Sequence, residues 1–141
     1  MSRSGYSEDC DGGALQLWRG AVQKSITGKR GQRLLRDIAD AMDAMPDKQL
    51  VADELVSADG DFCTLGVAGL ARGVVEKLKQ IDTDDRETIA KLLDVAPSLV
   101  AEISFENDNP FGYHSNETPE RRWSRMRAWV AAQIKTTGAQ P

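Results

Sequence analysis

The fold is decided by residues 15–46, whose sequence is LQLWRGAVQKSITGKRGQRLLRDIADAMDAMP. Apolar residues recur in this stretch every three or four positions, as at Trp18 and Val22, and this spacing places them on one face of an α-helix. Gly28 interrupts the pattern and Pro46 ends it, because neither residue suits a helix interior. The stretch therefore predicts two amphipathic helices that pack together as a helical hairpin.

The segment that follows predicts a β-hairpin and a short helix. An Asp-Gly pair at residues 59–60 lies between two apolar runs, which is typical of a tight turn between two strands. Thr64 is placed to cap a short helix that Gly73 ends. We therefore expect a small two-stranded β-hairpin near residues 50–63, followed by one helix.

The second half of the chain predicts further helices. The acid-rich residues 82–87 suit the positive end of a helix, and Thr118-Pro119 combines a capping hydroxyl with a proline at the first helical position. In the last helix Trp123 and Met126 belong to an apolar stripe, so the tryptophan is interpreted as a packing anchor. The expected fold is mainly α (α+β), with about five helices and the small β-hairpin.

The length of 141 residues predicts one domain. We expect a flexible N-terminal segment at residues 1–12, a single globular helical domain at 13–136 and a disordered tail at 137–141. No apolar stretch approaches the ~20 residues that a membrane-spanning helix needs, and the N-terminus does not resemble a signal peptide. Two cysteines provide no disulfide framework. The sequence thus predicts a cytoplasmic protein with no membrane partner.

Charge is distributed unevenly along the chain. Residues 12–36 contain six bases and no acid, residues 37–117 contain 18 acids and six bases, and residues 118–141 contain five bases and one acid. The basic segments either pair with acidic elements inside the protein or form a patch for a polyanion. If they form a patch, the candidate binding residues are Arg19, Lys24, Lys29, Arg30, Arg33, Arg122 and Arg125.

Residues 87–103 resemble a helix-turn-helix element. The second helix of such an element would have to enter the DNA major groove, yet here it presents Ser98, Ala101 and Glu102 and contains no arginine or lysine. DNA phosphates would repel a helix of this composition. The pattern therefore favours an ordinary pair of packed helices.

The sequence offers no coherent catalytic or metal-binding set. Cys63 follows an apolar run and is interpreted as a buried thiol rather than a nucleophile, and His114 has no ligand-type residue at metal-binding spacing. The polar loop at residues 107–116 also carries Phe111 and Tyr113, which either form a binding site or fold back onto the core. We expect no cofactor and no metal, and the residues favour a non-enzymatic role over an enzymatic one without deciding between them.

Several segments together resemble a family of small uncharacterised proteins encoded by tailed bacteriophages and prophages. The segments are SRSGY at residues 2–6, WRGAV at 18–22, GKRGQ at 28–32, DGDFCTLG at 59–66, END at 106–108, ETPERRW at 117–123 and MRAWV at 126–130. The resemblance covers nearly the whole chain. It implies a phage origin and a host-cell location, and it carries no established activity, cofactor or catalytic residue.

Two functional hypotheses follow. The first is a non-enzymatic interaction protein that binds a host protein, for example a defence factor (an anti-CRISPR-like role) or a regulatory factor. The alternative is a protein that binds nucleic acid or a nucleotide through the basic patch on the first helical hairpin. The sequence does not define the partner, the oligomeric state or the binding face.

Overall fold

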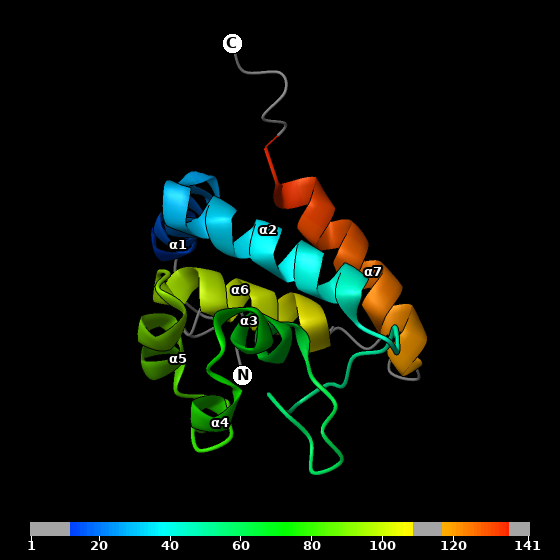
Figure 1. Ribbon diagram of the computed structural model, residues 1–141. Coiled ribbons are helices and arrows are strands. Elements are labelled where there is room, and N and C mark those ends of the chain that lie inside the picture. The colour runs from blue at the N-terminus through cyan, green and yellow to red at the C-terminus, as the bar shows by residue number, and fades with distance from the viewer. Residues whose placement is uncertain (1–11, 109–116, 136–141) are drawn as a thin grey trace.

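The computed structural model describes residues 12–108 and 117–135 (Figure 1). This part of the chain forms seven helices and contains no strand. The helices are α1 (Gly12–Thr27), α2 (Lys29–Ala44), α3 (Thr64–Arg72), α4 (Val75–Leu78), α5 (Arg86–Leu93), α6 (Pro97–Asp108) and α7 (Pro119–Gln133). The predicted tail at 137–141 lies outside the described residues, as does the predicted flexible segment at 1–12 except for Gly12.

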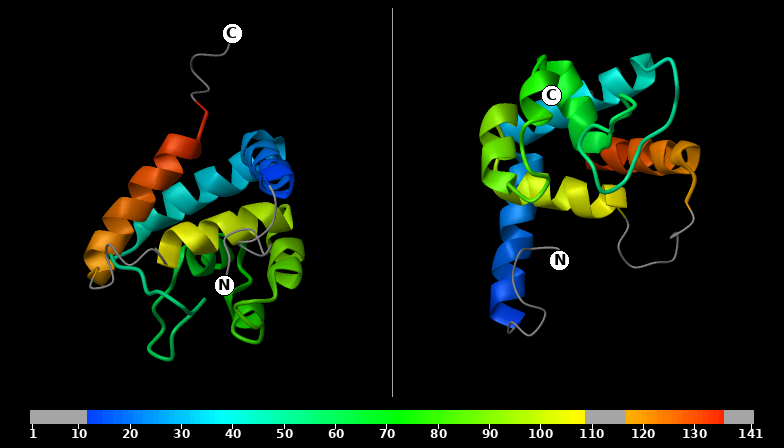
Figure 2. Two further views of the ribbon diagram at one scale, coloured as in Figure 1. Left: turned by 180° about the vertical axis from the view of Figure 1, so that it is seen from behind. Right: turned by 90° about the horizontal axis from the view of Figure 1, so that it is seen from below.

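Two helices occupy the centre of the arrangement. α2 contacts α1, α3 and α7, while α6 contacts α1, α3, α5 and α7. α2 and α7 lie side by side and run in opposite directions, so the start of α2 is near the end of α7 (Figure 1). α1 projects beyond the other helices at one end of the molecule (Figure 2). The predicted mainly helical fold is confirmed, and both helices expected in residues 15–46 are present. The predicted hairpin is not, because only Gly28 separates α1 from α2 and α1 runs across the start of α2 instead of lying antiparallel along it (Figure 2).

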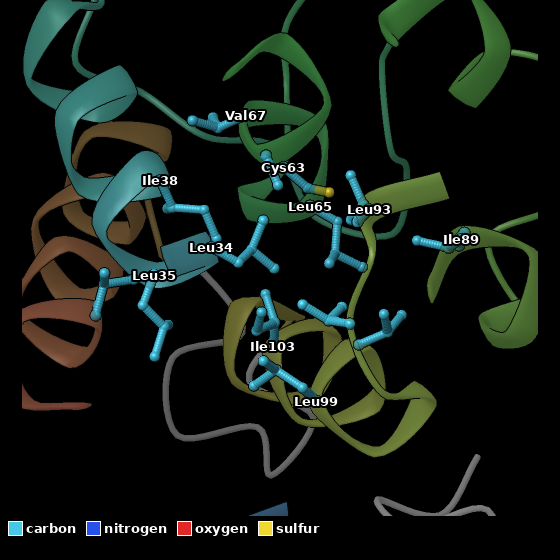
Figure 3. Close-up of a cluster of buried hydrophobic side chains, with 14 of the residues drawn as sticks. Leu34, Leu35, Ile38, Cys63, Leu65, Val67, Ile89, Leu93, Leu99 and Ile103 are labelled. Carbon is cyan, nitrogen blue, oxygen red and sulfur yellow. The ribbon is translucent and has the colours of Figure 1, made fainter. Parts of the chain in front are cut away.

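The core consists of aliphatic side chains that meet between α2, α3, α5 and α6 (Figure 3). Its fully buried members include Leu34, Ile38, Leu65, Leu93, Leu99 and Ile103. Burial of each such side chain contributes about 1.5–3 kcal/mol to folding. The helical periodicity of α2 therefore correctly identified the face that enters the core.

The predicted β-hairpin is wrong. Val56 and Phe62 form a single isolated antiparallel bridge, and the turn between them closes where the Ser57 amide donates to the Asp61 carbonyl at 2.7 Å. Asp53 adopts a left-handed backbone conformation, with φ of 65°, which interrupts the extended backbone that a longer strand requires. The turn chemistry was thus identified correctly, but the chain on either side does not form a ladder.

Helix ends differ from the sequence prediction in two places. The N-cap of α3 is Cys63, whose sulfur accepts a hydrogen bond from the Gly66 amide, so Thr64 is the first helical residue instead of the cap. α6 continues to Asp108, so Asn107 belongs to a helix and not to the predicted loop. The predicted helix start at Thr118 is confirmed, because its side chain accepts from the Arg121 amide.

The pair formed by α5 and α6 packs into the body of the protein. α6 is buried from Leu99 through Ile103, including Glu102 at 5% exposure. The face that a recognition helix would present to DNA is therefore inside the protein. The interpretation of residues 87–103 as two packed helices is confirmed.

Replacing Gly31 by alanine should destabilise the junction of α1 and α2. A Cβ atom at Gly31 would collide with the backbone carbonyl of Ser25, and a backbone atom cannot move aside as a flexible side chain can. We expect Gly31→Ala to lower the free energy of unfolding by about 1–3 kcal/mol in urea titrations followed by circular dichroism.

Gly20→Ala is the matched control for this prediction. Gly20 lies in α1 with no atom within 4 Å of the new Cβ, so alanine should stabilise that helix by up to about 1 kcal/mol. Equal unfolding midpoints for the two variants would contradict the close packing of α1 against α2.

Candidate binding grooves

The guanidinium group of Arg122 lies inside the protein. This side chain is 10% exposed, and its Nε donates to the Asn107 carbonyl at 3.1 Å. Nη1 donates to the Leu50 carbonyl at 3.4 Å. Arg122 of α7 thus joins the segment that precedes the Asp59-Gly60 turn to the end of α6. Arg122 was predicted as a binding residue, but its hydrogen bonds are used to hold three parts of the chain together.

Arg125 has a similar role beside it. Its Nε and Nη2 contact the two carboxylate oxygens of Glu117 at 2.7 and 2.9 Å, and its Nη1 donates to the Glu106 carbonyl at 2.7 Å. The Glu117 side chain is 4% exposed and lies 3.4 Å from Nε of Arg122 as well. The two arginines therefore satisfy carbonyls at the end of α6, and a buried carboxylate offsets their charge.

The side chain of Asn107 completes this arrangement. Its oxygen accepts hydrogen bonds from the amide of Thr64 at 3.0 Å and from the Thr64 hydroxyl at 2.8 Å, while its nitrogen donates to the Val51 carbonyl at 3.0 Å. We call Asn107, Glu117, Arg122 and Arg125 the polar cluster. It fixes residues 50–64 against α6 and α7.

A basic groove lies between the first half of α2 and the end of α7. It encloses about 550 Å³ and is lined by Lys29, Gln32, Arg33, Arg36, Asp37, Asp40 and Lys135. Lys135 donates from Nζ to the Thr27 carbonyl at 2.8 Å, and Arg36 donates to the Lys135 carbonyl at 3.3 Å. Four cationic side chains from two distant parts of the chain therefore converge on this groove.

The other predicted cations lie elsewhere. Arg19 and Lys24 are exposed on α1 but do not line the basic groove, and Arg30 forms an exposed ion pair with Asp94 at 3.2 Å. The structure thus brings together two of the seven predicted binding residues, Lys29 and Arg33. It adds Arg36 and Lys135, which the sequence analysis did not select.

An apolar groove of about 340 Å³ opens beside the second half of α2. Its floor is made by small and aliphatic residues of α2 and α3 and by Phe62 from the turn segment. Leu70 lines it and is 45% exposed, so it adds accessible apolar surface to the groove. The apolar lining residues are Ala41, Ala44, Met45, Pro46, Phe62, Leu70 and Ala71.

The chemistry of Cys63 argues against catalysis at this position. Burial raises the pKa of the Cys63 thiol to about 12, so the thiolate form that a nucleophile requires is absent near neutral pH. Among the residues that the structure describes, no three His, Cys, Asp or Glu side chains cluster in a way that could hold a metal ion. His114, Phe111 and Tyr113 of the predicted aromatic loop lie outside the described residues.

The native protein should protect the Cys63 thiol from modification. In a Cys10→Ser variant, which leaves Cys63 as the sole cysteine, we expect a disulfide exchange reagent at about pH 8 to react at least tenfold more slowly than with the urea-unfolded chain. Reaction at the unfolded rate in native buffer would contradict the burial of this side chain.

The chain matches no protein-family model, no curated protein and no solved structure. Within residues 12–108 and 117–135, no helix has the length and apolar character needed to cross a bilayer. The resemblance to phage and prophage proteins stays a prediction.

Proposed function

We propose that this protein acts by binding another protein, and that the apolar groove is the contact surface. Given the resemblance to phage proteins, the proposed partner is a host protein such as a defence or regulatory factor. The observation that carries the proposal is Leu70, a large apolar side chain left half exposed in a concave, mostly apolar surface. Apolar pockets of this kind receive the anchor residues that dominate protein interfaces.

The groove is able to accept one or two anchor side chains. Its volume of about 340 Å³ is at the lower end of the range for ligand pockets. An aliphatic or aromatic residue buried there would contribute roughly 1.5–3 kcal/mol from the apolar area removed from water. This is enough to define a central contact, while surrounding residues supply the remaining area.

The groove has an acidic rim, which indicates the charge of the partner. Asp47 and Asp61 line it, and the exposed Asp59 is next in sequence to the lining residue Gly60. The ammonium of the neighbouring Lys48 donates to the carbonyls of Asp43 and Met45 at the end of α2, and Lys48 does not line the groove. A partner segment with apolar anchors flanked by lysine or arginine fits best, since rim charges of opposite sign accelerate association.

Replacing Leu70 by aspartate should abolish this interaction without disturbing the core. We expect tagged wild-type protein to capture a stoichiometric protein partner from a bacterial lysate at moderate salt. Leu70→Asp should recover at least tenfold less of it by quantitative mass spectrometry, because the change adds a charge to the apolar contact and enlarges the acidic rim.

Leu17→Asp is the matched control for the groove. Leu17 is also an exposed leucine, 77% accessible, but it lies on α1 and does not line the apolar groove. This variant should retain the partner. Failure of the wild-type protein to capture any reproducible partner, or equal capture by both variants, would contradict the proposal.

A further inference from the structure

We propose that the basic groove between α2 and α7 is a separate binding site for consecutive phosphate groups of a polyanion, either a nucleic-acid backbone or a short polyphosphate chain. The site lies on a different surface from the apolar groove and does not depend on the proposed protein partner. Four cationic side chains without acidic partners in residues 12–108 and 117–135, together with the exposed start of α2, form this site.

The lining of the basic groove has a positive balance. Lys29, Arg33, Arg36 and Lys135 supply four positive charges, while the acids in the lining supply two negative ones, giving a formal sum of +2. One of these acids, Asp37, is already paired with Arg72 at 3.1 Å. The groove is therefore more positive than the formal sum suggests, in a protein whose net charge is −4.

Two of the four cations have no hydrogen-bond or ion-pair partner among the described residues. Lys29 and Arg33 are exposed and lie four positions apart on α2, a spacing that places them on the same face of the helix. Every other arginine of α2 is engaged, since Arg30 pairs with Asp94 and Arg36 donates to the Lys135 carbonyl. Lys29 and Arg33 are thus available to an external anion.

The other two cations are held in place by the protein. Arg36 and Lys135 bond across the groove, and Lys135 also bonds to the Thr27 carbonyl, so their positions are fixed before a ligand binds. Gln32 supports the same region because its Nε2 donates to the Gln133 carbonyl at 2.9 Å and its Oε1 accepts from the Lys135 amide at 2.8 Å. A preorganised wall loses less conformational entropy on binding.

The backbone at the start of α2 adds to the positive field. Its N-cap, Gly28, provides no side-chain hydrogen bond, and the first turn contains no acid. The unpaired amides and the helix dipole of such a terminus attract anions, and here they adjoin Lys29. Sulfate-like or phosphate oxygens fit these donors, whereas a single carboxylate would leave most of the four cations unmatched.

The direct test compares two charge-matched double variants. Lys29→Gln/Arg33→Gln removes the two available cations of the basic groove, and Arg19→Gln/Lys24→Gln removes the same charge from exposed positions on α1. Binding of fluorescein-labelled single-stranded and duplex DNA is followed by fluorescence anisotropy from about 50 to 200 mM salt. Inorganic tripolyphosphate serves as the competitor.

We expect wild-type protein and the α1 control to bind at low salt, and the groove variant to bind at least tenfold more weakly. The slope of log affinity against log salt should fall by roughly 1.4–1.8 in the groove variant, which corresponds to two lost phosphate contacts. Displacement by tripolyphosphate at equal phosphate concentration would identify a short polyphosphate ligand, while resistance to it would identify the nucleic-acid backbone.

Two results would overturn the proposal. One is the absence of binding to DNA and of any tripolyphosphate effect on the thermal unfolding of wild-type protein at low salt. The other is an equal loss of binding in both double variants, which would show that general charge and not the basic groove is responsible. The Leu70→Asp variant should bind these probes like wild type, so failure here is distinguishable from failure of the proposed protein interaction.

Discussion

The buried amide of Asn107 is the constraint on which the arrangement of this protein depends. Residues 50–64 cross the body without forming a β-ladder, so their backbone groups need other hydrogen-bond partners. Asn107 supplies a donor to Val51 and an acceptor to Thr64, and Arg122 supplies a donor to Leu50. A buried polar group left without such a partner costs about 1–3 kcal/mol, so the polar cluster determines where this segment lies.

The positions of both grooves depend on the polar cluster. The segment fixed by the polar cluster carries Phe62 into the lining of the apolar groove, which it shares with Leu70 of α3. The same cluster places the start of α7, and a bidentate pair between Arg127 and Asp43 joins α7 to the end of α2 at 2.8 and 2.9 Å. This pairing lowers the pKa of the Asp43 carboxyl. With α7 held along α2, Lys135 reaches the start of α2 and completes the basic groove.

Local patterns predicted the local structure well. The spacing of Trp18 and Val22, the glycine at residue 28 and the Thr118-Pro119 pair all indicated the correct helices, because each signal acts over one or two turns. The Asp59-Gly60 turn was also correct, but strand pairing beyond it was not. There the left-handed backbone at Asp53 interrupts the extended chain. The side chain of Asn107, more than 40 residues from Thr64, provides a hydrogen bond that a β-ladder would otherwise supply.

The candidate sites depend on contacts between residues far apart in the sequence, which a local sequence pattern does not reveal. Arg122 bonds to Leu50 across 72 positions, so its internal role is invisible in the sequence of α7. Arg36 and the Lys135 carbonyl are 99 positions apart, which is why the basic groove was only partly predicted from Lys29 and Arg33. The apolar groove had no sequence signal, because apolar residues at helical spacing indicate a packed face and do not show which of them stay accessible.

Hydrogen exchange of an Asn107→Leu variant, followed by mass spectrometry, tests this account most directly. Leucine keeps the branched shape of the side chain but removes the bonds to Val51 and Thr64. We expect amides of residues 50–64 to lose most of their protection, while those of α2 near Leu34 and Ile38 stay protected by the aliphatic core. Wild-type protection of residues 50–64 in this variant would contradict it.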